Sequence, residues 1–250
     1  MDANIWLALL FTSAAGLSTT FGSVLGIALK KPSARAMSLT LGFAAGVMIY
    51  ISFAELLQGA IDSSSFLVGN AAFFGGIALM FVIDLSIPHE YMAEHHDPGG
   101  KGLLRTGMLV ALGLGIHNFP EGMATFAGTL KDTKLGLAIA VAIAVHNIPE
   151  GLAVAAPIYA ATGSRKKAFG YSFLSGAAEP LGAAVAALVL YRFLTDSVLG
   201  MMLGVVAGLM VYISLDELVP ASREYGHAHT AIIGTVAGMA IMALSLAMLK

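Results

Sequence analysis

The feature that most constrains this chain is a series of eight apolar segments, each long enough to cross a lipid bilayer as a helix. A bilayer core of about 30 Å needs roughly 20 apolar helical residues per crossing. Short polar connections separate the segments, which favours one helical bundle, an all-α integral membrane protein with a single domain over residues 1–250. We place the spans near residues 4–29, 37–57, 66–87, 106–129, 134–160, 167–191, 198–219 and 230–249.

Composition supports this assignment and excludes other classes. Hydrophobic residues make up 58% of the chain and charged residues 11%, and the mean hydropathy is +0.84. The lipid bilayer is therefore an expected partner. A formal net charge of −2 gives no basis for nucleic-acid binding, and the absence of Cys excludes disulfides and thiolate metal ligands.

The distribution of Lys and Arg predicts the orientation of the spans. Nine of the thirteen follow spans one, three, five and seven. By the positive-inside rule these connections face the cytoplasm, so both termini are expected on the extracytoplasmic side. The connection with Lys131 and Lys134 disagrees with the rule. The nine are Lys30, Lys31, Arg35, Lys101, Arg105, Arg165, Lys166, Lys167 and Arg223.

Seven acidic residues lie within the predicted spans, whereas every Lys and Arg lies at a span end or in a connection. Ionised carboxylates are costly in a bilayer, so these must be protonated, reached by water or neutralised by a mobile cation. For those near span ends, interfacial solvation is an equal alternative; Glu121, Glu150 and Glu179 are too central for it. The acids within spans are Glu55, Asp84, Glu121, Glu150, Glu179, Asp216 and Glu217.

An internal repeat predicts how the spans are arranged. The segments LGFAAGVMIYISFAELLQGA from Leu41 and LGVVAGLMVYISLDELVPAS from Leu203 agree at ten of twenty positions. They lie in spans two and seven. Successive spans alternate in direction, and these two are five places apart in the series, so they run in opposite directions. This indicates an inverted repeat of three spans, a central antiparallel pair and three more spans, an arrangement that places a binding site near the membrane midplane in many transporters.

The central pair of spans carries a repeated polar motif, IHNFPEG at 116–122 and VHNIPEG at 145–151. On a helix that advances about 100° per residue, His117 and Glu121 differ by roughly 40° and Asn118 and Glu121 by roughly 60°. One carboxylate can therefore share a cation with an imidazole on one side or an amide oxygen on the other. His146, Asn147 and Glu150 repeat this arrangement, and two facing copies would converge on one or two cation sites.

Prolines add to this pattern. The proline of each motif cannot donate to the carbonyl four residues back, which is that of Ile116 or Val145, so the freed oxygen needs water or a cation. In span six, Glu179 is followed by Pro180, which would free the carbonyl of Gly176. We therefore expect a third central carboxylate beside a third broken helical turn.

The pair HNFPEG and HNIPEG, together with SGAAEPLG, resembles the ZIP family of divalent-metal transporters over essentially the whole chain. The resemblance implies uptake of Zn²⁺, Fe²⁺ and other divalent cations (Mn²⁺, Co²⁺, Cd²⁺) across the bacterial inner membrane. It implies a zinc site of Glu121, His146 and Glu150 with His117 nearby, and an iron-type site of Asn118, Glu121, Asn147, Glu150 and Glu179. Coordination chemistry agrees, because imidazole suits Zn²⁺ and oxygen-rich sets suit Fe²⁺ or Mn²⁺.

Two other functions are compatible with the same residues. His and Glu four apart could hold a catalytic zinc in an intramembrane hydrolase, but H-E-x-x-H is absent, and a metal sensor would use similar ligands. We expect a transporter, not an enzyme, with no catalytic cofactor; a homodimer is compatible with the sequence. His89, His95 and His96 lie in a short acidic connection that either collects metal or is simply a solvated loop.

Overall fold

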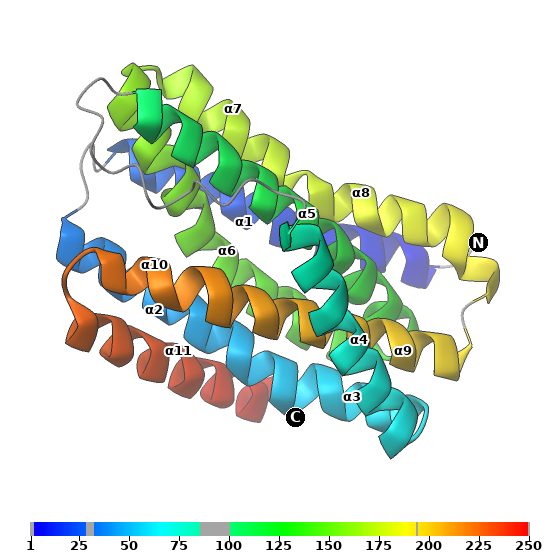
Figure 1. The fold of residues 1–250 in the computed structure, drawn as a ribbon. Coiled ribbons are helices and arrows are strands. Elements are labelled where there is room, and N and C mark those ends of the chain that lie inside the picture. The colour runs from blue at the N-terminus through cyan, green and yellow to red at the C-terminus, as the bar shows by residue number, and fades with distance from the viewer. Residues whose placement is uncertain (1–2, 29–32, 86–100, 194, 250) are drawn as a thin grey trace.

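The computed structural model describes residues 3–28, 33–85, 101–193 and 195–249, and within them it is helical, without strands. The all-α prediction is thus confirmed for this part of the chain. Most helices follow one another through short connections (Figure 1). The α-helices are α1 (Ala3–Ala28), α2 (Ala34–Ile51), α3 (Leu57–Ser63), α4 (Phe66–Leu85), α5 (Lys101–Lys131), α6 (Thr133–Thr162), α7 (Arg165–Gly176), α8 (Ala178–Val185), α9 (Asp196–Ile213), α10 (Val219–Glu224) and α11 (Ala228–Leu249).

Seven helical stretches of the described residues are long and apolar enough to cross a membrane. The predicted span 106–129 lies in α5, several of whose side chains fall outside the described part, and it is not among the seven. A multi-pass membrane protein is therefore supported, and eight crossings remain a prediction. The seven are Asn4–Ala28, Ala34–Ser63, Phe66–Leu85, Thr133–Thr162, Arg165–Val189, Asp196–Glu224 and Ala228–Met248.

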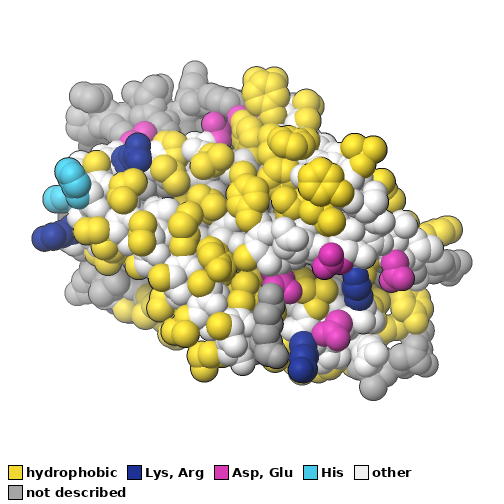
Figure 2. Space-filling view, turned by 90° about the horizontal axis from the view of Figure 1, so that it is seen from below, with side chains coloured by type: hydrophobic (Ala, Val, Ile, Leu, Met, Phe, Trp, Pro, Cys, Tyr) yellow, Lys and Arg dark blue, Asp and Glu magenta, His cyan; other side chains and the backbone are white. Residues whose placement is uncertain are grey.

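The outer surface of the bundle is apolar where a membrane protein would face lipid. On α4, Phe66, Leu67 and Phe74 are exposed, and on α11 Ile233 and Met248 are exposed. Figure 2 shows hydrophobic side chains over the middle of one face, with histidine and basic side chains at its left end. Such a surface would be unfavourable in water, because large contiguous apolar patches are rare on soluble proteins.

Helix ends follow from local sequence signals. The Asp132 side chain accepts a hydrogen bond from the Leu135 N–H at 2.9 Å, which caps the start of α6 and separates it from α5. Gly163, with φ of 64°, ends α6 in the left-handed conformation that glycine adopts without strain. The Ser164 side chain then accepts from the Lys167 N–H and starts α7.

The helices form two groups, which Figure 1 shows one above the other. In the first, α1 packs on α6 and α5 packs on α6, α7 and α8. In the second, α2 packs on α11, and α4 and α3 pack on α9. The groups meet where α6 contacts α2 and α5 contacts α9. The predicted metal motifs all belong to the first group.

Glycines bring paired helices into backbone contact, and the contacts of the first group occur twice. A methyl group at Gly22 of α1 would overlap the carbonyl oxygen of Ile148 in α6. At Gly182 of α8 it would overlap the carbonyl oxygen of Phe119 in α5. Phe119 and Ile148 occupy the same position of the two HNxPEG motifs. The contact of α1 with α6 is therefore matched by that of α8 with α5.

The second group shows the same correspondence. A methyl group at Gly46 of α2 would overlap the carbonyl oxygen of Thr235 in α11, and one at Gly208 of α9 would overlap that of Phe73 in α4. Gly46 and Gly208 are matched positions of the sequence repeat. The contact of α2 with α11 thus corresponds to that of α9 with α4.

The repeat also has a matched irregularity. The helix that begins as α2 widens into a π-helix at Ser52–Leu56, and the helix that begins as α9 does so at Ser214–Leu218. In each case the serine hydroxyl donates to the carbonyl four residues back, that of Met48 or Met210, at 2.7 Å. Both methionines are buried in the hydrophobic core.

Candidate metal-binding site

Helices α5, α6 and α8 bring most of the predicted ligands into the interior of the first helix group. Each of the described ones is at most 1% exposed. The side chain of His117 lies outside the described part of the chain, so its predicted proximity to the site is not tested. The buried residues of this cluster are Asn118 and Glu121 of α5, His146, Asn147 and Glu150 of α6, and Glu179 of α8.

The two motifs contact each other across the pair formed by α5 and α6. His146 Nε2 lies 3.5 Å from Glu121 Oε1, and both side chains are buried. Two ligand atoms of a tetrahedral Zn²⁺ with bonds of about 2.0–2.2 Å lie roughly 3.4 Å apart, so this nitrogen and oxygen already stand at a separation that one ion could bridge. The described part of the structure thus supplies a nitrogen–oxygen pair from opposite copies of the motif.

Glu179 joins the cluster from a helix break. Helix α7 ends at Gly176 and α8 begins at Ala178, so the turn predicted to break before Pro180 is interrupted in the structure. The break places Glu179 in the first turn of α8, where the Asn147 side chain donates to Glu179 Oε1. In the pair of Asn147 and Glu179, the amide nitrogen is used in this hydrogen bond. The atoms that remain for a cation are therefore all oxygens.

Backbone carbonyls orient both asparagines. Asn147 Nδ2 also donates to the carbonyl oxygen of Ala15 in α1 at 3.1 Å, and Asn118 Nδ2 donates to that of Ser175 in α7 at 3.1 Å. With the nitrogens held in this way, the amide oxygens are the atoms left to face a ligand. Ala15 and Ser175 could not be predicted from the sequence, because any residue supplies a backbone carbonyl that can accept such a hydrogen bond.

Several oxygens of the cluster lack a hydrogen-bond partner among the described residues. They belong to two amides and two carboxylates, and burial without a partner is costly for both groups. A divalent cation would satisfy them. These atoms are Asn118 Oδ1, Glu121 Oε1 and Oε2, Asn147 Oδ1 and Glu179 Oε2.

The cluster differs from a closed structural metal site. Among the described residues, no three His, Asp or Glu side chains stand close enough together to hold an ion by themselves. The amide oxygens would have to complete the coordination. Neutral oxygens bind Zn²⁺ more weakly than thiolate or imidazole, which suits an ion that must leave again.

The acids nearer the helix ends have a different environment. Asp84 of α4 is buried and accepts a hydrogen bond from the Tyr212 hydroxyl of α9 at 2.8 Å, so solvation alone does not explain it. Asp216 is exposed, in agreement with the solvated alternative. The predicted loop histidines His89, His95 and His96 lie outside the described residues.

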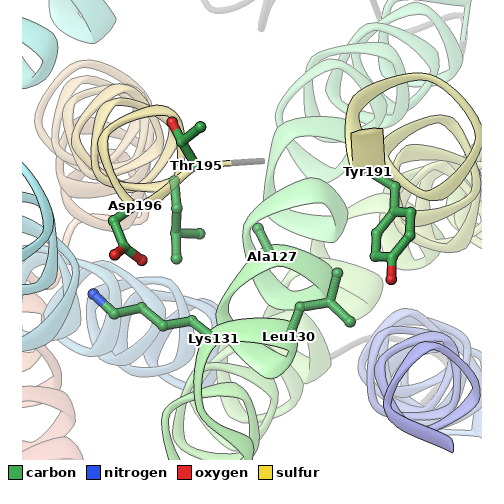
Figure 3. A pocket seen from close by; sticks show the side chains of 7 residues that line it. Ala127, Leu130, Lys131, Tyr191, Thr195 and Asp196 are labelled. Atoms are coloured by element: carbon green, nitrogen blue, oxygen red, sulfur yellow. The ribbon is translucent and has the colours of Figure 1, made fainter. Parts of the chain in front are cut away.

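A cavity of about 320 Å³ lies apart from the cluster, at the end of α5. It is lined by Lys131 of α5, Tyr191, and Asp196 of α9, and Figure 3 shows the Lys131 side chain extending toward Asp196. The nearest lining residue of α5, Ala127, is six residues beyond Glu121, or about 9 Å along the helix. The cavity is therefore separate from the buried ligands.

Residues 88–246 match the sequence model of the family described as ZIP Zinc transporter. The chain is 52% identical to a protein of Chlorobium phaeovibrioides named Zinc transporter ZupT, over 98% of this chain and 99% of the relative. Relatives of the same name from Streptococcus mutans and Campylobacter jejuni are 49% and 48% identical, over 98% of this chain and 98% and 97% of their own lengths. The resemblance seen in the motifs is thus confirmed over nearly the full chain.

Proposed function

The chain belongs to the ZIP family of zinc transporters, and from that premise we propose that it carries Zn²⁺, and also Fe²⁺ and Mn²⁺, into the cytoplasm through the buried cluster of α5, α6 and α8. The observation that carries the proposal is a set of buried carboxylates and amides with no described Lys or Arg side chain among them. Every Lys and Arg whose exposure is described is exposed, so none lies in the cluster. A mobile cation supplies the missing positive charge.

The ligands divide into two overlapping sets. Zn²⁺ would use His146 with Glu121 and Glu150 after Glu150 moves closer to the other two, and the 3.5 Å approach of His146 to Glu121 supports this pairing. Fe²⁺ and Mn²⁺ would use Asn118, Asn147 and Glu179 with the same two glutamates. The buried amide oxygens and the contact of Asn147 with Glu179 support the second set. His117 would stand beside the zinc position.

The helices would form the predicted inverted repeat of eight spans. The matched glycine contacts and the matched π-helices support an exchange of span one with six, two with seven, three with eight and four with five. Such a repeat puts the central pair, α5 and α6, at the axis between the halves. The ligand cluster would then lie near the membrane midplane, with both chain termini outside the cytoplasm.

Inward transport needs no second ion on energetic grounds. A divalent cation that crosses 100 mV, negative inside, gains about 4.6 kcal/mol, twice the value for a single charge. This corresponds to roughly three decades of concentration. A simple electrical gradient is therefore enough to drive uptake.

Transport can be tested with purified protein in liposomes that contain a fluorescent zinc indicator, under an inside-negative potential. We expect Zn²⁺ entry into proteoliposomes and not into empty liposomes. Glu121→Ala and Glu150→Ala should each reduce entry of Zn²⁺ and Fe²⁺ to the background, because each glutamate serves both ligand sets. Correct folding of the variants is checked by size-exclusion chromatography.

Two results would contradict the proposal. Zinc or iron flux retained in both glutamate variants would exclude the shared ligands. A wild-type protein that moves no metal but cleaves a membrane peptide in a zinc-dependent manner would instead be an intramembrane hydrolase.

A further inference from the structure

Thr19 of α1 is a buried polar residue that the proposed ligand sets do not use. Its side chain is fully buried, and its hydroxyl has no hydrogen-bond partner among the described residues. Other buried helical threonines bond to the carbonyl four residues back, as Thr12 does to Ala8 at 2.9 Å and Thr129 does to Thr125 at 2.7 Å. Thr19 therefore differs from these threonines, because its buried hydroxyl has no partner among the described residues.

Backbone contacts make Thr19 the counterpart of Glu179. A methyl group at Gly151 of α6 would overlap the carbonyl oxygen of Thr19, and one at Gly122 of α5 would overlap that of Glu179. Gly122 and Gly151 close the two HNxPEG motifs at the same position. Thr19 is thus placed against α6 as Glu179 is placed against α5.

The crossing of α1 with α7 confirms this correspondence independently. A methyl group at Gly16 would lie 2.6 Å from the carbonyl oxygen of Gly176 and 3.4 Å from Glu179 Cβ. One at Gly176 would lie 2.5 Å from the carbonyl oxygen of Gly16 and 2.9 Å from Thr19 Cβ. The two glycines therefore pack against each other, and each also approaches one member of the Thr19 and Glu179 pair.

The asparagines extend the correspondence to the ligand atoms. Asn147 and Asn118 donate to the carbonyls of the residues just before Gly16 and Gly176, respectively. Asn147 also donates to Glu179; Thr19 occupies the corresponding place beside Asn118, but no hydrogen bond joins these two side chains. The Oδ1 atom of Asn118 and the hydroxyl of Thr19 both lack a hydrogen-bond partner in the described part of the chain.

We propose that Thr19 Oγ1 and Asn118 Oδ1 form a neutral, oxygen-only half-site for a partly hydrated divalent cation, opposite the charged half-site of Asn147 and Glu179. The inference rests on the proposed function. Hydroxyl and amide oxygens are hard, uncharged ligands, which suit Mn²⁺ and Fe²⁺ better than Zn²⁺. Thr19 would therefore act as a specificity residue that favours the oxygen-preferring metals.

The test compares Thr19→Val, which keeps the shape of the side chain and removes the hydroxyl, with Thr19→Ser, which keeps the hydroxyl. Uptake of radioactive Mn²⁺ and Zn²⁺ is measured in proteoliposomes over a range of concentrations. The loss of one oxygen ligand should raise the KM for Mn²⁺ by roughly three- to tenfold in Thr19→Val. The KM for Zn²⁺ should stay within about twofold, and Thr19→Ser should resemble the wild type.

Thr12→Val is the matched control, because Thr12 is also buried on α1 but its hydroxyl is bonded within the helix. It should leave the ratio of the two KM values unchanged. An unchanged ratio in Thr19→Val, whether from no effect or from equal losses for both metals, would overturn the proposal. So would a Thr19→Ser variant as impaired for Mn²⁺ as Thr19→Val.

A binding measurement separates this inference from the proposed function. Purified protein in detergent is titrated with Mn²⁺ alone, and free Mn²⁺ is followed by electron paramagnetic resonance. Weaker Mn²⁺ binding by Thr19→Val than by wild type and Thr12→Val supports the half-site even if no transport is seen. Equal binding by all three proteins would overturn it, even if the wild type transports zinc.

Discussion

At the scale of single residues, the sequence identified the candidate ligands because their chemistry is conspicuous. Charged and imidazole side chains in a long apolar run, repeated as HNxPEG, have few structural explanations. What orients Asn118 and Asn147 was not predictable in the same way. Their partners are carbonyls of Ala15 and Ser175, which any residue could supply, and only the helix crossing brings them near.

Substitutions of different ligands in the cluster should affect zinc uptake and iron uptake to different extents. His146→Ala removes a nitrogen that Zn²⁺ prefers and leaves the oxygen set in place, so zinc uptake should fall more than iron uptake. Glu179→Ala should do the reverse, because it removes the carboxylate bonded to Asn147. Each loss should be worth about one to three kcal/mol, which corresponds to roughly five- to 150-fold in apparent affinity.

The measurement is zinc and iron uptake by both variants at matched protein amounts, over a range of metal concentrations. Parallel losses for both metals in both variants would show that the two ligand sets are one indivisible site. The division drawn from coordination chemistry would then be wrong.

At the scale of helices, the sequence predicted which two helices resemble each other but not which structural irregularity they share. Ten identities between the segments from Leu41 and Leu203 indicated two similar helices. That both widen into π-helices at Ser52 and Ser214 could not be read from them, because a π-helix differs from an α-helix by a single inserted residue and has no composition of its own. Serine bonds to the preceding turn accompany both, and such bonds bend helices.

Substitutions at glycine contacts should act in equivalent pairs. Gly22→Ala would force α1 away from the Ile148 carbonyl, and Gly182→Ala would force α8 away from that of Phe119. Each should destabilise the protein by about 1–3 kcal/mol, as overpacking does. We expect similar drops in the apparent Tm, measured in detergent by fluorescence-detected size exclusion after heating.

Gly75→Ala on α4 is the control. A methyl group there would have no atom within 4 Å other than those of its chain neighbours and of the nearby backbone of its own helix. It should leave the apparent Tm unchanged or raise it slightly, since alanine favours helices. If Gly22→Ala and Gly75→Ala had the same apparent Tm, α1 and α6 would not be in backbone contact.

At the scale of the whole molecule, hydropathy and charge carry most of the information. Alternation of long apolar runs predicted a multi-pass helical protein, and the seven long apolar helices agree with it. Which helices pair was not predictable from the runs, because a lipid-facing span and a buried one are equally apolar. The division into two groups depends on glycine contacts between residues more than a hundred positions apart, such as Gly46 and Thr235.

Orientation can be tested with single cysteines in a chain that has none. Ser64 follows α3 and Ser164 precedes α7, at opposite ends of their spans according to the charge distribution. A cysteine at 64 should react with an impermeant thiol reagent in intact cells. One at 164 should react only after the membrane is made permeable, and the opposite sidedness would reverse the proposed topology.

The difference between Thr19 and Glu179 has a consequence for the resting state of the transporter. Two identical halves related by an inverted axis would give two conformations of equal energy, one open to each side of the membrane. A hydroxyl in one half and a buried carboxylate in the other would remove this degeneracy, because Glu179 would meet a different environment in each conformation. In the proposed inverted repeat, the carrier would therefore prefer one orientation before any voltage or concentration gradient acts on it.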